Sequence, residues 1–236
     1  MPLLKTISGI RGTIGGRAGD NLTPQDIVEC TAAYGAWLLQ NGAQSRIVIG
    51  RDGRISGPMV SALVSNTLIA LGIEVIDLGL STTPTVEMAV PHHGAGGGII
   101  LTASHNPMEW NALKLLGPAG EFISQNDGEA FLALLHSGQI DYASVDRLGA
   151  YRTDEDALSL HIRSILALPD VDADTVRTKR FRIVVDAVNS TGALAVPALL
   201  EQLGCEIVLL NGEINGRFAH NPEPLPEHLG QLTEMV

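Results

Sequence analysis

Residues 46–79 read RIVIGRDGRISGPMVSALVSNTLIALGIEVIDLG, and their outline, RIVIG…LGIEVIDLG, recurs as RIVVD…LGCEIVLLN over residues 182–211. Each copy has a short β-branched run, a turn, a helix-length segment, a Leu-Gly pair and a second β-branched run. Such short apolar runs are typical of buried strands in a parallel sheet. A strand–helix–strand unit that occurs twice in one chain predicts two related α/β domains.

The segments around the first copy extend this alternation of strands and helices. Thr23 and Pro24 have the residue types of a helix N-cap and first turn, and Gly42 is a typical stop. The strand over residues 111–117 fits an antiparallel direction as well as a parallel one. The expected helices cover residues 24–41, 58–71, 84–91, 124–137 and 154–168, and two further strands cover residues 97–102 and 111–117.

These elements predict a layered α/β/α domain over residues 1–150, with a mixed, mostly parallel sheet. Residues 151–236 then form the start of a second, related α/β domain, and the polar segment 169–179 is expected to be a plain connection. Two parallel strands are too few for an independent sheet. The second domain therefore either packs on the first or belongs to a longer polypeptide, and we favour the longer polypeptide.

Composition excludes some classes of protein. The chain has 236 residues, 45% of them hydrophobic, and a net charge of −11. This charge argues against nucleic acid or an anionic membrane as the main partner. Neither a membrane-spanning run nor a secretory signal is expected. Cys30 and Cys205 have no metal-type spacing, which predicts two reduced, buried thiols in a cytoplasmic protein.

Three polar or glycine-rich segments carry the candidate chemistry. Ligands of open α/β sheets bind beyond the carboxyl ends of the strands. The second and third segments follow strands, so we expect them to meet in one crevice, where glycines let backbone N–H groups approach an anion. The segments are SGIRGTIGG (8–16) with Arg11, GRDGRISG (50–57) with Arg51, Asp52 and Arg54, and TASHNPMEWNALK (102–114) with Ser104 and His105.

Other interpretations of these residues stay open. A glycine–arginine loop is often a surface turn, and the pair His92–His93 is more typical of a solvated turn than of a metal site. Ser104 and His105 could form a hydrolase dyad, but adjacent side chains seldom face each other and the chain has no Gly-x-Ser-x-Gly elbow. A non-catalytic module that binds a nucleotide or a sugar phosphate is also possible.

Together, the segments resemble the α-D-phosphohexomutase family, which includes phosphoglucomutase, phosphomannomutase and phosphoglucosamine mutase. The resemblance rests on TASHNP, on the N-x-x-K formed by Asn111 and Lys114, on GRDGR and on GIRG. Residues 1–150 resemble the first domain of that family. Residues 151–236 resemble the start of its second domain, through VVDAVNSTGALAVPALLEQLG and FAHNPEP.

The resemblance implies an isomerase that moves phosphate between C1 and C6 of a hexose phosphate, through a phosphoserine and a bisphosphorylated sugar. Ser104 would carry the phosphoryl group and would bind Mg²⁺ through it. His105, Asn106 and Asn111 would contact the phosphate or the sugar. Lys114 would act as a proton shuttle or a charge clamp, although NALK stands where NGxK is common.

For the remaining residues the resemblance is less specific. Arg11 would point toward the site, Asp52 would orient the transferring group, and Arg51 would either steady that group or be structural. The family's metal motif, D-G-D-x-D-R, does not occur before Val236. The resemblance therefore implies that this chain holds Mg²⁺ poorly and turns over no sugar without missing C-terminal domains. The sugar stays open, although the opening SGIRG favours phosphoglucomutase/phosphomannomutase.

Overall fold

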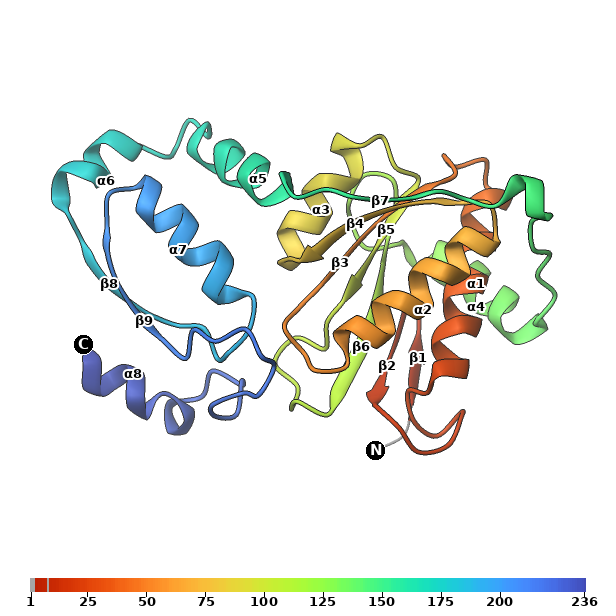
Figure 1. The fold of residues 1–236 in the computed structure, drawn as a ribbon, viewed down its shortest axis with the longest axis horizontal. Helices are drawn as coiled ribbons and strands as arrows, with labels where there is room; N and C mark the ends of the chain where they lie inside the picture. The colour runs from red at the N-terminus through yellow and green to blue at the C-terminus, as the bar shows by residue number, and fades with distance from the viewer. Residues whose placement is uncertain (1–2, 8) are drawn as a thin grey trace.

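The computed structural model describes residues 3–7 and 9–236, and Figure 1 shows two α/β units of unequal size. A seven-stranded mixed sheet, ordered β1-β2-β6-β5-β3-β4-β7, lies at the centre of the larger unit. Strands β4, β3 and β5 run parallel, whereas β6 runs antiparallel to both β5 and β2. The strands are β1 (Leu4–Thr6), β2 (Gly9–Thr13), β3 (Arg46–Arg51), β4 (Glu74–Leu80), β5 (Gly97–Leu101), β6 (Trp110–Leu116) and β7 (Tyr151–Thr153). The predicted fold class is confirmed, and the strand predicted over 111–117 is antiparallel.

Helices cover both faces of this sheet because alternate strand residues enter opposite cores. In β3, Ile47 and Ile49 pack on one face, whereas Val48 packs on the other. The N-cap predicted at Thr23 is confirmed, and Ser124 caps α4 in the same way, since each side chain accepts a backbone N–H group of the first turn. The first face is covered by α1 (Pro24–Gln40), α2 (Gly57–Ala70) and α4 (Gln125–Ser137), and the second by α3 (Thr83–His92) and α5 (Ala157–Leu166).

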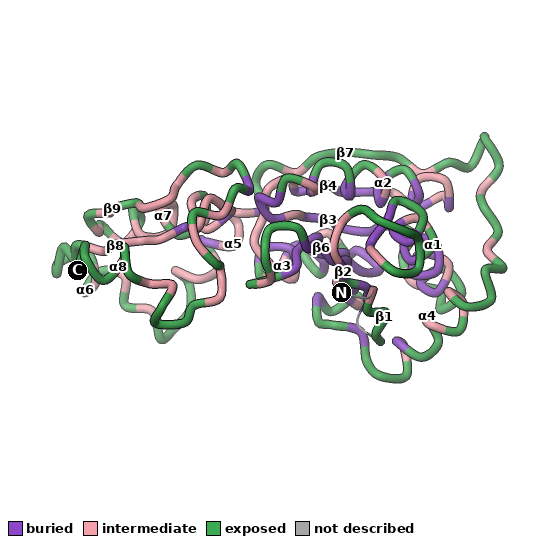
Figure 2. The backbone as a smooth tube through the Cα atoms, turned by 90° about the horizontal axis from the view of Figure 1, so that it is seen from below, coloured by how far each residue is buried: buried purple, intermediate pink, exposed green. Residues whose placement is uncertain are grey.

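The smaller unit repeats the strand–helix–strand pattern, as its sequence predicts. Strands β8 (Arg182–Asp186) and β9 (Glu206–Leu210) are parallel, and α7 (Gly192–Gln202) connects them. Buried backbone is concentrated in the larger unit in Figure 2. Among the described residues beyond position 170, only Ala187, Thr191 and Gly216 are buried. The smaller unit thus has little fully buried core of its own.

Some local predictions were wrong. The glycine-rich segment 8–16 contains strand β2 rather than a continuous loop, and its Ser8 lies outside the described residues. The segment 169–179 contains helix α6 (Ala173–Lys179), which begins where the Asp172 carboxylate accepts the Thr175 N–H at 2.9 Å. A short helix α8 (Gly230–Met235) follows near the end of the described chain.

Two further expectations concern the cysteines and the domain boundary. Cys30 is buried as predicted, but Cys205 is partly exposed. Strand β7, just beyond residue 150, pairs with β4 at the edge of the large sheet. The boundary near residue 150 stays a prediction. In the described part of the chain, no helix combines the length and the apolar character that crossing a membrane requires.

A buried tyrosine ties α1 to the middle of the sheet. The Tyr34 hydroxyl lies 2.5 Å from the Leu116 carbonyl oxygen and 3.1 Å from that of Gly98. A Cβ on Gly97 would lie 2.2 Å from the same hydroxyl, so the glycine makes room for it. The hydroxyl therefore supplies a hydrogen-bond donor to strand carbonyls that water cannot reach.

We expect Tyr34→Phe to lower the free energy of unfolding by about 1–2 kcal/mol, because buried carbonyls lose their donor. Urea denaturation followed by circular dichroism measures this change. Tyr142→Phe, at an exposed tyrosine, is the matched control and should leave the midpoint unchanged. Equal stability of the two variants would contradict the assigned role of the Tyr34 hydroxyl.

Candidate functional site

The segments after β3 and β5 meet at the carboxyl ends of these strands, as the sequence predicts. The Asp52 N–H donates to the Leu101 carbonyl at 3.1 Å. The Thr102 hydroxyl donates to the Asp52 carboxylate at 2.6 Å and accepts the Ser104 N–H at 3.0 Å. A chain of hydrogen bonds therefore joins the buried carboxylate after β3 to the backbone of the exposed Ser104.

Ser104 is presented to solvent in an unusual backbone conformation. Its φ is +56°, in the left-handed region that residues other than glycine seldom occupy. Such a conformation costs on the order of 1–3 kcal/mol and persists only where the surroundings impose it. We refer to residues 102–107 as the serine loop.

Arg54 supplies much of that constraint. Its side chain is fully buried, and its Nε donates to the Asp52 carboxylate at 3.0 Å. Its two terminal nitrogens donate to four backbone carbonyls, those of Ser104, Asn106, Pro107 and Trp110, at 2.6–2.9 Å. Burial lowers the pKa of Arg54, while Asp52 acts in the opposite direction.

The side chains of Ser104 and His105 face each other, contrary to the expectation for adjacent residues. Ser104 Oγ lies 3.4 Å from His105 Nδ1, and His105 Nε2 lies 3.0 Å from a Glu223 carboxylate oxygen. Glu223 belongs to the smaller unit, and the sequence analysis did not single it out. The only signal for it was the FAHNPEP segment that contains it.

The two predicted asparagines are engaged within the protein. Asn106 donates to the Ala103 carbonyl at 2.7 Å and so closes the turn of the serine loop. Asn111 is fully buried, and its side chain donates to Ser56 Oγ at 2.9 Å and accepts the Ala112 N–H at 2.8 Å. Asn106 therefore lies at the candidate site, whereas Asn111 lies beneath it.

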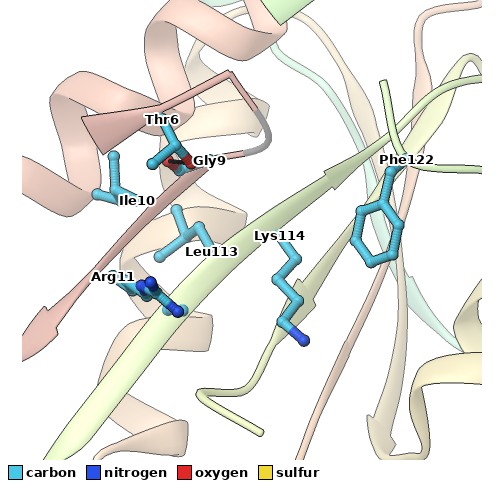
Figure 3. A pocket seen from close by; sticks show the side chains of 8 residues that line it. Thr6, Gly9, Ile10, Arg11, Leu113, Lys114 and Phe122 are labelled. Atoms are coloured by element: carbon cyan, nitrogen blue, oxygen red, sulfur yellow. Dashed lines mark hydrogen bonds between the residues drawn. The ribbon is translucent and has the colours of Figure 1, made fainter. Parts of the chain in front are cut away.

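Arg11 and Lys114 come together on neighbouring strands. Arg11 pairs with Ala112 and Lys114 pairs with Gly9, so both side chains project from one face of the β2–β6 pair. Both line a cavity of about 420 Å³ together with Phe122. Figure 3 shows Lys114 between Arg11 and Phe122. Burial lowers the pKa of Lys114, Glu87 and Asp52 act in the opposite direction, and Arg11 lowers it further.

The structure places Arg51 neither among the residues that contact the serine loop nor beside Arg11 and Lys114. Its guanidinium lies 3.4 Å from the Asp52 carbonyl, and its side chain lines a separate cavity with Asp77 and Tyr151. Asp52 is buried and its carboxylate is bonded to Thr102 and to Arg54. Asp52 is thus placed to organise the serine loop from within.

Three contacts join residues of the smaller unit to the segments that follow β3 and β5. The Gly53 N–H donates to Ser190 Oγ at 3.1 Å, and the Arg54 guanidinium lies 5.0 Å from the centre of the Phe218 ring. The third contact is that of a Glu223 carboxylate oxygen with His105 Nε2, at 3.0 Å. Both loops of the larger unit are therefore in contact with the smaller one.

The described residues do not by themselves make a magnesium site. Among them, no three or more His, Cys, Asp or Glu side chains are grouped so as to hold a metal ion. Mg²⁺ prefers several oxygen ligands, but Asp52 is paired with Arg54, and Glu223 with His105. His93 forms an ion pair with Asp154 at 2.8 Å, so it is not the free side chain of a solvated turn.

Comparison with known protein families gives two matches. Residues 3–139 match the model of phosphoglucomutase/phosphomannomutase, alpha/beta/alpha domain I, and residues 159–236 match that of domain II. The chain belongs to the phosphoglucomutase/phosphomannomutase family. The family resemblance inferred from the sequence is therefore confirmed.

Individual relatives in this family carry different names. A "Phosphoglucomutase/phosphomannomutase" of Thermococcus kodakarensis is 36% identical over 95% of this chain and 50% of its own length. A "Probable phosphoglucosamine mutase" of Methanopyrus kandleri is 35% identical over 97% of this chain and 48% of its own. A solved structure from Thermus thermophilus, named "putative phosphomannomutase", is 27% identical, with a TM-score of 0.84 over 100% of this chain and 52% of its own. The chain spans about half the length of these family members.

His220 anchors the segment of the smaller unit that carries Phe218 and Glu223. Its Nδ1 lies 2.8 Å from the Asn221 carbonyl and its Nε2 lies 2.9 Å from the Asp186 carboxylate, so only the imidazolium can donate to both. Burial opposes the charged ring, but these bonds raise the pKa of His220 above its ordinary 6.5. Burial likewise opposes ionisation of Asp186, but bonds from Asn211 and His220 lower its pKa below 3.8.

We expect His220→Gln to lower the midpoint of thermal unfolding most between about pH 4 and 6.5, where both charges are present in both states. The stability from His220 is lost as pH rises through its raised folded-state pKa. The stability from Asp186 is lost as pH falls through its lowered one. Differential scanning calorimetry of both proteins across this range, and at about pH 9, measures the difference. A difference that does not shrink at high pH would contradict the charged pair.

Proposed function

We propose that this chain carries the phosphoserine part of a phosphohexomutase, with Ser104 as the phosphoryl carrier. The observation that supports this most directly is the exposed Ser104, held at a positive φ on a loop that a buried arginine fixes. A serine hydroxyl held in one position is pre-organised for phosphoryl transfer, in which the attacking and leaving oxygens must lie in line with the phosphorus. Family membership supports the same reaction class.

In the proposed reaction a phosphoryl group leaves Ser104 Oγ for a hydroxyl of a hexose phosphate. The serine O–P bond breaks and an O–P bond to the sugar forms. The attacking sugar hydroxyl loses one proton and the leaving serine oxygen takes up one, so the net step needs no further reactant. His105 Nδ1, 3.4 Å from Ser104 Oγ, is the nearest described group that can give a proton to the serine oxygen. The bisphosphorylated sugar later returns its other phosphate to the serine.

Arg11 and Lys114 are proposed to hold anionic oxygens during this transfer. Phosphoryl transfer depends mainly on positioning and on stabilisation of charge. The two cations line one open cavity on the strands β2 and β6, and the carboxylates of Glu87 and Asp52 favour the charged form of Lys114. We therefore favour a charge clamp over a proton shuttle for Lys114.

The substrate is proposed to be a hexose 1- or 6-phosphate. We favour a glucose or mannose phosphate, and glucosamine phosphate is the alternative because some relatives carry that name. We further propose that the complete reaction needs Mg²⁺ and parts of the polypeptide that the 236 residues do not supply. Assays of this chain and of a full-length relative with each sugar phosphate and Mg²⁺ test this, and equal activity of the two would contradict it.

The alignment of Ser104, His105 and Glu223 also supports a second candidate, a serine hydrolase. Ser104 Oγ lies 3.4 Å from His105 Nδ1, and His105 Nε2 lies 3.0 Å from the Glu223 carboxylate. The three side chains therefore form a row of nucleophile, base and acid. Labelling by a fluorophosphonate probe at Ser104, together with absence of a phosphoryl group there, would favour the hydrolase.

In a full-length protein that contains this chain, and with Mg²⁺ present, we expect Ser104→Ala to abolish phosphorylation by glucose 1,6-bisphosphate, because the accepting oxygen is removed. Intact-mass spectrometry detects the added phosphoryl group, and peptide mapping locates it. The matched control is Ser137→Ala, at an exposed serine that ends α4, and it should gain phosphate as the unchanged protein does. Phosphorylation of the Ser104→Ala variant would refute the proposed carrier.

Lys114→Ala should slow this phosphorylation by about 100-fold or more, because one fixed charge at the transferring group is lost. In the unchanged protein the rate should fall as pH rises through the lowered pKa of Lys114, since the neutral amine no longer clamps an anion. Lys179→Ala, at an exposed lysine of α6, is the control. A rate that increases over the same pH range would indicate a proton acceptor instead of a clamp.

A further inference from the structure

We infer that Arg54 is the positioning residue of the serine loop, and that Phe218 makes its position depend on the smaller unit. This inference rests on the proposed function, in which Ser104 is the phosphoryl carrier. Arg54 lies beneath the loop and touches no reacting atom, so its action on the reaction passes through the backbone of residues 104–107.

All five N–H groups of the Arg54 guanidinium have partners. One donates to Asp52, and the other four donate to the carbonyls of Ser104, Asn106, Pro107 and Trp110. A guanidinium is rigid and planar, with its five donors in fixed directions. The carbonyls must therefore converge on one plane, which fixes the middle and the C-terminal end of the serine loop.

This convergence imposes the conformation of Ser104. A carbonyl that accepts from a buried cation lies inside the protein, and a trans peptide turns its N–H in the opposite direction. The inward Ser104 carbonyl thus directs the His105 N–H away from Arg54. The left-handed φ of Ser104 is the backbone twist that accompanies this arrangement.

Lysine cannot replace this arginine. An ammonium group has three donors and no planar fork, so at least two of the five acceptors would lose their partner. Those acceptors are buried or half-buried, where an unpaired carbonyl costs on the order of 1–3 kcal/mol. The loop can recover that energy only by moving toward water, which releases Ser104 from its fixed geometry.

The N–H groups at the edge of the guanidinium donate to residues of the larger unit, whereas its face contacts a residue of the smaller unit. The Phe218 ring lies 5.0 Å from the Arg54 carbon, within the range of a cation–π contact. Because Arg54 is buried, this contact also keeps water from the carbonyls that it binds. Movement of the Phe218 segment therefore exposes the hydrogen bonds that hold the serine loop.

The test compares Arg54→Lys and Phe218→Leu in a full-length protein that contains these residues, with Arg46→Lys as a matched control. Arg46 begins β3, the strand that precedes Arg54, and also pairs with a carboxylate, that of Glu74 at 2.6 Å. It lies at the opposite end of β3 from the segment that contains Arg54. Hydrogen exchange of peptides that cover residues 102–107 is measured alongside phosphorylation by glucose 1,6-bisphosphate.

We expect exchange in residues 102–107 to accelerate about tenfold or more in Arg54→Lys, and by a smaller factor in Phe218→Leu. The maximal rate of phosphorylation should fall about 100-fold in Arg54→Lys, with the half-saturating concentration of the bisphosphate unchanged. Arg46→Lys should change neither quantity. If Arg54→Lys does not fold, Phe218→Leu carries the test by itself.

Several results would overturn the inference. Unchanged exchange in residues 102–107 would show that Arg54 does not hold the loop, and equal acceleration in every peptide would show a merely structural role. A loop that loosens in Arg54→Lys but not in Phe218→Leu would remove the dependence on the smaller unit. If Ser104 gains no phosphate even in a full-length protein that contains this chain, while the loop still loosens in both variants, the proposed function fails and the holding of the loop stands.

Discussion

The fold brings one buried positive charge to the place where two parallel strands end. Arg54 is withdrawn from water, and burial alone would lower its pKa. The cost of burying a cation is offset only by close, well-directed partners. Here the partners are one carboxylate and the carbonyls of a loop from the neighbouring strand. The charge therefore joins the segment after β3 to the segment after β5, and the exposed position of Ser104 follows from that junction.

The order of the strands provides the rest of the site. Because β6 runs antiparallel between β5 and β2, its residues return alongside β5 and place Lys114 between Ile100 and Gly9. Helix α3 packs over β3 and β5 on the face of the sheet from which Lys114 projects. The face of β2 and β6 that holds Arg11 and Lys114 is left open as a cavity. A cationic surface thus arises on the strands next to the serine loop, in a chain whose net charge is −11.

Much of the fold could be predicted because its strands are β-branched runs and its helices carry recognisable caps. The strands at 46–51 and 97–101, and the caps Thr23 and Ser124, are local signals that tertiary structure preserves. Strand β2 was missed because GIRGT has few strand-forming side chains. Its strand character comes from backbone pairing with β6, which no local pattern encodes.

The candidate site shows the same division. The motifs pointed to Ser104, His105, Asp52, Lys114 and Arg11 because each lies in a short, recognisable segment. They could not separate the two arginines of GRDGR, one of which is buried under the loop while the other lines a different cavity. Glu223 meets His105 from a distant part of the chain. A contact such as that between Glu223 and His105 depends on how the two units pack, and no spacing of residues in the sequence predicts that packing.

The thin interior of the smaller unit has a consequence for the chemistry. A segment with few buried side chains opens at a lower free energy than a well-packed core. When it opens, Phe218 leaves the guanidinium and Glu223 leaves the imidazole of His105. The equilibrium between closed and locally unfolded forms of residues 182–236 would then set the fraction of molecules whose serine is ready to react. Temperature and denaturant would reduce that fraction well before the large sheet melts.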